Sequence, residues 1–186
     1  MIPAPKNKAV FLDRDGVLNR AVVRAGRPYP PACLSELELL PGVREACAVL
    51  RDAGYLLVMV TNQPDIARGT LTQGTLDQMN TWLARELHLD DVRVCPHDDR
   101  DACACRKPKP GLVTSAAQEH GIDLGLSFLV GDRWRDIEAG REAGVRTVFI
   151  DYGYREKCAP EPDCTVQNLA QAADWILAAT AAEVSR

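Results

Sequence analysis

Two carboxylates at the end of a short apolar run constrain what this chain can fold into more than any other feature. Residues 8–12 (KAVFL) predict a buried strand, and Asp13, Arg14, Asp15 and Gly16 follow it directly. If the strand geometry continues through Asp13, alternation brings both acids to the same side, and Gly16 lets the chain turn away tightly. Two carboxylates this close repel each other unless a cation or a shared proton lies between them. The pair therefore indicates either a site for a hard metal ion or a strand that ends in a solvated polar turn.

Apolar and amphipathic segments alternate along the rest of the chain. Further buried strands are predicted for residues 55–60, 91–94, 126–130 and 145–150. Helices are predicted for residues 43–53, 72–87, 111–120, 134–143 and 166–179. This alternation is typical of a parallel sheet with right-handed crossovers. We therefore expect a single Rossmann-like α/β domain of three layers over residues 1–186, without an inserted cap domain, so that only loops cover the site.

Composition and charge exclude several classes of function. The net charge of −4 provides no basic footprint for nucleic acid, which requires clustered Lys and Arg. No apolar run approaches the ~20 residues that a membrane-spanning helix needs, and residues 9–12 are too short for the core of a signal peptide. We therefore expect a cytoplasmic protein that binds neither nucleic acid nor a membrane, and we also expect a monomer.

The cysteines predict a metal site. Four of the residues that zinc prefers lie within eleven positions: Cys95, His97, Cys103 and Cys105. Three thiolates and one imidazole are the ligand set of a closed, tetrahedral structural zinc site, whereas the alternative is a loop of free thiols. We expect the zinc loop, residues 95–105, to be inserted before the helix at 111–120. The other four of the seven cysteines have no partners at metal-ligand spacing, so we expect core or surface thiols there.

Polar residues also follow two other predicted strands and precede one predicted helix. They are Thr61-Asn62-Gln63, Arg106-Lys107-Pro108 and Gly131-Asp132-Arg133. An acidic pair, a hydroxyl, a basic residue and a further acid, in this order, resemble the four motifs of the haloacid dehalogenase superfamily of phosphatases. The resemblance runs from about residue 8 to about residue 150.

The zinc loop narrows the resemblance. Cys-x-His followed by Cys-x-Cys-Arg-Lys-Pro is similar to the heptose bisphosphate phosphatases and the histidinol phosphatases. The segments Asp13-Arg-Asp-Gly16, Thr61-Asn-Gln63 and Ile66-Ala-Arg-Gly69 resemble the heptose bisphosphate group. The chain departs from that group at Pro64-Asp65, where the heptose enzymes usually carry Ser-Gly.

The resemblance implies a Mg²⁺-dependent phosphatase that works through a phosphoaspartate. Asp13 would be the nucleophile and Asp15 the acid and base, with Mg²⁺ held by Asp13, the backbone carbonyl of Asp15, and Asp132. Asp136 would lie next to the metal ligands without binding the metal itself, or would only be an acid favoured at a helix start. Thr61 and the Asn62 backbone would bind the phosphoryl group, and Lys107 would neutralise its charge.

The resemblance also implies a substrate pocket for a small phosphorylated sugar. The substrate expected is D-glycero-D-manno-heptose 1,7-bisphosphate, from which the 7-phosphate is removed. Arg106 would bind a second anionic group on the substrate, and Arg133 would touch it as well. The remaining pocket wall is expected from Ala21, Val22, Val23, Arg24, Gln63 and Pro64.

Several other functions stay open on the sequence. A histidinol-phosphate or nucleotide phosphatase could use the same residues on another substrate, and a nucleic-acid end-processing phosphatase is disfavoured by the acidic balance. A different class is a zinc-stabilised binding module without catalysis. The complete set Asp13, Asp15, Thr61, Lys107 and Asp132 favours an enzyme over such a module.

Overall fold

A six-stranded parallel sheet forms the centre of the protein. The structure is a computed structural model that describes residues 7–158 and 160–184. The strand order is β5-β4-β1-β6-β7-β8, and every neighbouring pair is parallel. The strands are β1 Lys8–Leu12, β4 Tyr55–Asn62, β5 Asp91–Cys95, β6 Phe128–Gly131, β7 Arg146–Ile150 and β8 Cys164–Val166.

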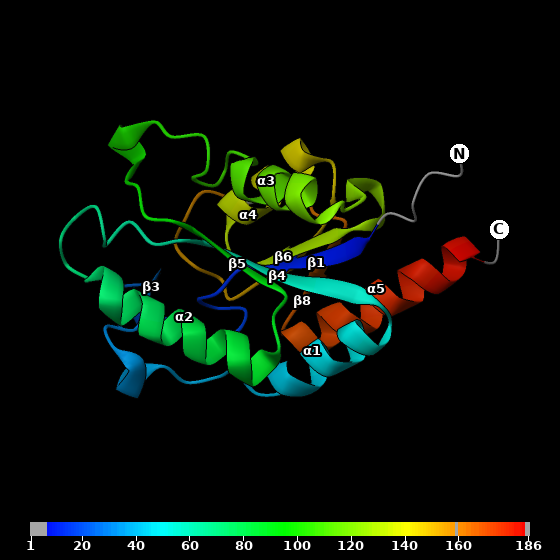
Figure 1. Cartoon of the computed structure of the whole chain (residues 1–186), viewed down its shortest axis with the longest axis horizontal. Coiled ribbons are helices and arrows are strands. Elements are labelled where there is room, and N and C mark those ends of the chain that lie inside the picture. Colours follow the sequence, from blue (N-terminus) through cyan, green and yellow to red (C-terminus); the bar gives the residue numbers. More distant parts are fainter. Residues whose placement is uncertain (1–6, 159, 185–186) are drawn as a thin grey trace.

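Helices cover both faces of this sheet, so the three-layer α/β fold predicted from the sequence is confirmed. One face carries α1 Val43–Asp52, α2 Gln73–Leu87 and α5 Leu169–Val184. The opposite face carries α3 Gly111–His120 and α4 Trp134–Ala143 (Figure 1). Short 3-10 turns lie at Leu34–Glu36, Asp99–Asp101 and Leu124–Leu126. Among the described residues, no helix is long and apolar enough to cross a membrane.

The central strand β1 is buried on both faces, which explains its uninterrupted apolar sequence. Val10 and Leu12 pack into the hydrophobic core under α1, α2 and α5. Ala9 and Phe11 point the other way, into the core under α3. The two cores therefore fix β1 from above and below, and with it the position of the residues that follow Leu12.

Three short strands were not predicted. The segment around Arg27, predicted as a Pro-rich loop, forms an antiparallel hairpin from β2 Val22–Arg24 and β3 Arg27–Tyr29. Strand β8 at the sheet edge was also missed, and β6 begins at Phe128 because Leu126 lies in a 3-10 turn and is 49% exposed. Strands of three residues are too short for alternation to show, and Pro28 is tolerated because β3 lies in a two-stranded ribbon.

The sheet order brings the polar motifs together. Strand β1 lies between β4 and β6, so the chain leaves β1 for one side of the sheet and returns to the other. The carboxyl ends of parallel strands at such a switch point form a crevice in which ligands bind. The β2–β3 hairpin and the loop after β5 lie at this same end of the sheet (Figure 1).

Candidate active site

A buried lysine occupies the centre of the crevice. The ammonium nitrogen of Lys107 lies 2.9 Å from Asp13 Oδ1 and 2.5 Å from Asp136 Oδ1, and it donates to the Val60 carbonyl at 2.7 Å. Burial alone would lower the pKa of Lys107, but the two carboxylates outweigh it and hold this pKa above its ordinary value. Asn62 fixes the lysine backbone, because its side chain donates to the Lys107 carbonyl and accepts from the Lys107 amide.

Three buried carboxylates converge beside this lysine. Asp13, Asp132 and Asp136 each offer an oxygen within 4.8 Å of the others. Burial raises the pKa of Asp13 to about 6 despite the attraction of Lys107. Burial, with Asp13 and Asp136 nearby, also raises the pKa of Asp132 well above its usual range. One ammonium group therefore does not balance the charge of this cluster.

The cluster fits a divalent cation with hard oxygen ligands. Both oxygens of Asp136 are engaged, one by Lys107 and the other by the Arg133 amide at 3.0 Å. Both oxygens of Asp132 are buried and neither has a close hydrogen-bond partner among the described residues, although the Tyr154 hydroxyl lies beside this carboxylate. Buried carboxylate oxygens without a partner are costly unless an ion binds them. Asp13 and Asp132 are thus the side chains that could hold Mg²⁺, which prefers carboxylate oxygens and water.

Asp15 is held by a set of donors. The guanidinium of the fully buried Arg14 lies 3.0 Å from Asp15 Oδ2, and Asn19 donates to Oδ1 at 2.9 Å. The Gln63 amide donates both to Asp15 Oδ2 at 2.8 Å and to Thr61 Oγ1 at 2.9 Å. Gln63 therefore aligns Asp15 with Thr61, which brings an acid and a hydroxyl to the mouth of the lysine site.

Gly16 permits the close approach of the Asp13–Asp15 turn to Asp132. Its φ is +90°, a left-handed conformation that favours glycine. A Cβ atom at this position would lie 1.9 Å from Asp132 Oδ2. Glycine is therefore required here both for the backbone conformation and for space.

The four predicted zinc ligands come together at the end of β5 and in the loop that follows it. The three sulfurs are separated by 3.2 Å (Cys95–Cys105), 3.5 Å (Cys103–Cys105) and 3.6 Å (Cys95–Cys103), and His97 Nδ1 lies 3.4 Å from Cys105 Sγ. Sulfurs bound to one tetrahedral zinc at about 2.3 Å are about 3.8 Å apart, so the observed spacings are close to such a site. They are too long for a disulfide, and the cysteines are free thiols.

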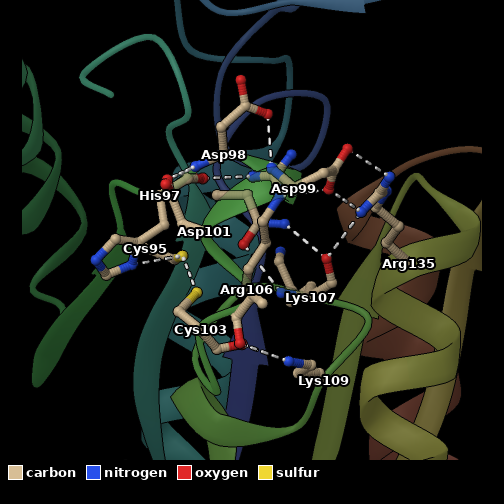
Figure 2. A network of polar contacts seen from close by, with 12 residues as sticks. Cys95, His97, Asp98, Asp99, Asp101, Cys103, Arg106, Lys107, Lys109 and Arg135 are labelled. Carbon is tan, nitrogen blue, oxygen red and sulfur yellow. Dashed lines mark hydrogen bonds and ion pairs between the residues drawn. The ribbon is translucent and has the colours of Figure 1, made fainter. Parts of the chain in front are cut away.

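Asp99 ties this loop to helix α4 (Figure 2). Its Oδ1 accepts from Arg106 Nε at 2.7 Å and from Arg135 Nη1 at 2.9 Å, while its Oδ2 accepts from Arg135 Nη2 at 3.2 Å. The pairing with Arg106, and then with Arg135, lowers the pKa of Asp99. Arg106 also donates to the His97 carbonyl at 3.1 Å. The loop of residues 95–105 therefore orients Arg106 beside Lys107.

A cavity of about 350 Å³ opens above these residues. Its base includes Asp13, Asp15, Thr61, Asn62 and Lys107. Around them the wall carries five arginines: Arg27, Arg68, Arg106, Arg133 and Arg135. A cavity floor with carboxylates and a lysine, below a wall rich in arginine, suits a substrate with more than one anionic group.

Known proteins resemble this chain in sequence and in fold. A family model described as HAD-hydrolase-like matches residues 104–172. The D-glycero-beta-D-manno-heptose-1,7-bisphosphate 7-phosphatase of Escherichia coli (strain K12) is 35% identical over 182 residues, covering 91% of this chain and 87% of that protein. The protein of the same name from Helicobacter pylori (strain J99) is also 35% identical, with 91% and 97% covered. The chain belongs to the haloacid dehalogenase superfamily, among the heptose bisphosphate phosphatases.

A solved structure of this family agrees with the fold. The crystal structure of the D,D-heptose 1,7-bisphosphate phosphatase from B. bronchiseptica, complexed with magnesium and phosphate, matches with a TM-score of 0.81 and 32% identity. The match covers 92% of this chain and 99% of that one. As a member of this phosphatase family, the chain is a phosphoric monoester hydrolase.

The structure brings most of the predicted site residues to the cavity but arranges some of them differently. Gln63 is fully buried and contacts Asp15 and Thr61 from behind, while Pro64 lines the cavity. From the hairpin, the cavity wall is formed by residues 27–30 and not by residues 21–24, which were predicted there. Arg133 lines the wall, and its guanidinium pairs with Glu156 at 2.6 Å.

Sequence reasoning missed the residues that support the site. They include Arg14, Asn19 and Asn80 under Asp15, and Arg27, Arg68 and Arg135 on the wall. For Arg14 a signal existed, because an arginine between two acids in a buried segment needs a carboxylate partner. For the others, the contacts join segments far apart in sequence and leave no local pattern.

Replacing Gly16 with alanine tests the close approach to Asp132. Gly16→Ala must displace the Asp132 carboxylate, so kcat/KM should fall by about 10²-fold or more, the cost of a misplacement near 1 Å. Gly144→Ala is the matched control, because Gly144 also has positive φ (+82°) but no atom within 4 Å of its Cβ position. The control should lose stability through backbone strain and keep its activity. Equal losses of activity would show that strain, and not the approach to Asp132, matters at Gly16.

Proposed function

We propose that this phosphatase removes the 7-phosphate of D-glycero-D-manno-heptose 1,7-bisphosphate. One observation carries the proposal: Asp13, Asp15 and Lys107 form the floor of a cavity whose wall is rich in arginine. The relatives that cover most of the chain are named for this activity. A histidinol-phosphate-type substrate is the alternative. It has one phosphate and would offer no second anionic group to the arginines of the cavity wall.

The first chemical step transfers the phosphoryl group to Asp13. One Asp13 carboxylate oxygen attacks phosphorus in line, and the bond between phosphorus and the sugar oxygen breaks. The leaving oxygen takes the proton of Asp15, which Arg14, Asn19 and Gln63 hold in place. Lys107 stays charged beside Asp13, so it stabilises the negative charge that spreads over the phosphoryl oxygens.

The second step hydrolyses the phosphoaspartate. Asp15, now ionised, removes a proton from a water molecule, whose oxygen attacks phosphorus and breaks the bond to Asp13. Inorganic phosphate leaves, and both acids return to their starting states. Dividing the reaction in this way replaces one difficult displacement with two easier ones.

Two metals belong to this proposal. Asp13 and Asp132, with the Asp15 backbone carbonyl, would hold Mg²⁺, which neutralises phosphoryl charge when bound. Its presence in the B. bronchiseptica relative supports this assignment. Cys95, His97, Cys103 and Cys105 would hold structural zinc, supported by ligand atoms that all lie within 4.8 Å of one another. Arg106, oriented by this loop, would bind the second phosphate.

We further propose that residues 1–186 act as one domain and as a monomer. Asp13, Thr61 and Asp132 lie at the ends of neighbouring strands of one parallel sheet, which supports a site complete within one chain. The free thiols of the metal loop favour a reducing compartment such as the cytoplasm.

The nucleophile can be tested by replacing Asp13 with asparagine. An amide cannot attack phosphorus, so kcat on the heptose bisphosphate should fall by about 10³-fold or more while the fold stays intact. Wild type should also bind beryllium fluoride in the presence of Mg²⁺, and Asp13→Asn should not. Asp174→Asn, an exposed position on α5, is the matched control. Substantial turnover by purified Asp13→Asn would rule out the covalent mechanism.

The zinc site can be tested by metal analysis and thermal unfolding. Freshly purified protein should contain one zinc per chain. Structural sites bind zinc with an apparent free energy of ~10–16 kcal/mol, which stabilises the folded state. Cys103→Ser should therefore lower the midpoint of thermal unfolding sharply. Cys158→Ser, at an exposed thiol, should not. Wild-type protein without zinc would contradict the assignment.

A further inference from the structure

Ion pairs neutralise most of the arginines on the cavity wall. Four of the five make such pairs: Arg106 and Arg135 with Asp99, Arg133 with Glu156, and Arg68 with Asp98 and Asp65. A guanidinium that shares its charge with a carboxylate attracts a further anion less than a free one does. The charge available to a substrate therefore differs strongly from one arginine to the next.

Arg27 is the exception on this wall. It lies at the start of β3, is exposed, and lines the cavity. Its side chain makes no ion pair or hydrogen bond with any residue that the structure describes. Arg27 therefore presents a full positive charge and five unoccupied donor hydrogens to the cavity.

The remote phosphate of a bisphosphate needs more charge than the paired arginines supply. A phosphate monoester carries about −1.5 to −2 at neutral pH. Arg106 and Arg135 share one carboxylate, Asp99, so this group retains one positive charge. Arg133 is balanced by Glu156, and Arg68 faces two carboxylates. Arg27 supplies the further positive charge that balances the remote phosphate.

The hairpin holds Arg27 at the cavity. The Arg155 amide donates to the Gly26 carbonyl at 3.0 Å, which docks the hairpin tip onto the loop after β7. The Arg155 side chain packs against Gly26, where a Cβ atom would lie 3.0 Å from it. Arg24 is the cross-strand partner of Arg27, but its guanidinium lies 5.8 Å from the centre of the Tyr29 ring and does not line the cavity. Two arginines on one ribbon thus differ in their access to the substrate.

We propose that Arg27 is a specificity-determining residue that binds the remote phosphate of the sugar bisphosphate, together with the Arg106–Asp99–Arg135 group. This inference rests on the proposed function. It adds a residue from the β2–β3 hairpin to the recognition of the end of the substrate that does not react.

Steady-state kinetics on two substrates test this role. Arg27→Ala should lower kcat/KM for heptose 1,7-bisphosphate by about tenfold or more, mainly through a higher KM. A loss of about tenfold is the smallest effect expected when a hydrogen bond to a charged group is removed. The same variant should hydrolyse p-nitrophenyl phosphate, which has no second anionic group, within about twofold of wild type. Arg27→Lys should recover most of the loss. Arg24→Ala is the matched comparison on the same ribbon and should lose much less than Arg27→Ala.

Ionic strength provides a second readout. Because the contact is electrostatic and exposed, kcat/KM of wild type for the bisphosphate should fall with added salt, and Arg27→Ala should flatten this dependence. Equal losses on both substrates, or equal losses in Arg24→Ala and Arg27→Ala, would overturn the proposal. If wild type does not act on the bisphosphate, the proposed function fails, and this outcome is distinct from a failure at Arg27.

Discussion

The active site depends on one buried ammonium group. Lys107 joins Asp13 after β1 to Asp136 in α4 and to the Val60 carbonyl in β4, so one side chain ties together three elements that are distant in sequence. Removing this ammonium group would leave the buried carboxylates uncompensated, at a cost of ~3–5 kcal/mol. The same contacts keep the lysine charged beside Asp13, which the proposed phosphoryl transfer requires of it.

The loop of residues 95–105 leads into this lysine and fixes its position. Lys107 follows Cys105 by two residues, and its carbonyl accepts from Asn62 at 3.0 Å and from Arg135 at 3.3 Å. Arg106 is fixed by Asp99 and by the His97 carbonyl. The folded loop thus places two cations side by side: Lys107 contacts the buried carboxylates, and Arg106 lies in the cavity wall. Loss of the loop structure would disturb both.

Sequence alone predicted the long strands and the residues at their ends, for a physical reason. Strand β1 is buried on both faces, so its apolar run is continuous, and Asp13 and Asp132 follow neighbouring strands whose ends must meet. The β2–β3 hairpin and β8 were not predictable, because three residues carry no periodic signal. The inward orientation of Gln63 was equally hidden, since it depends on a contact with Asp15 across 48 positions. Ion pairing at the cavity wall, which distinguishes Arg27 from its neighbours, appears only when the segments are assembled.

We infer that the excess of buried carboxylates beside Lys107 forms a magnesium site, and thermal unfolding of Asp132→Asn tests this most directly. Burial raises the pKa of Asp132, so at neutral pH this group destabilises the metal-free native state relative to the unfolded state, in which it ionises freely. In magnesium-free buffer, Asp132→Asn should therefore unfold at a higher temperature than wild type. Added Mg²⁺ should raise the midpoint of wild type and leave that of the variant unchanged. A variant that is less stable than wild type without magnesium, and that still gains stability when magnesium is added, would contradict the account.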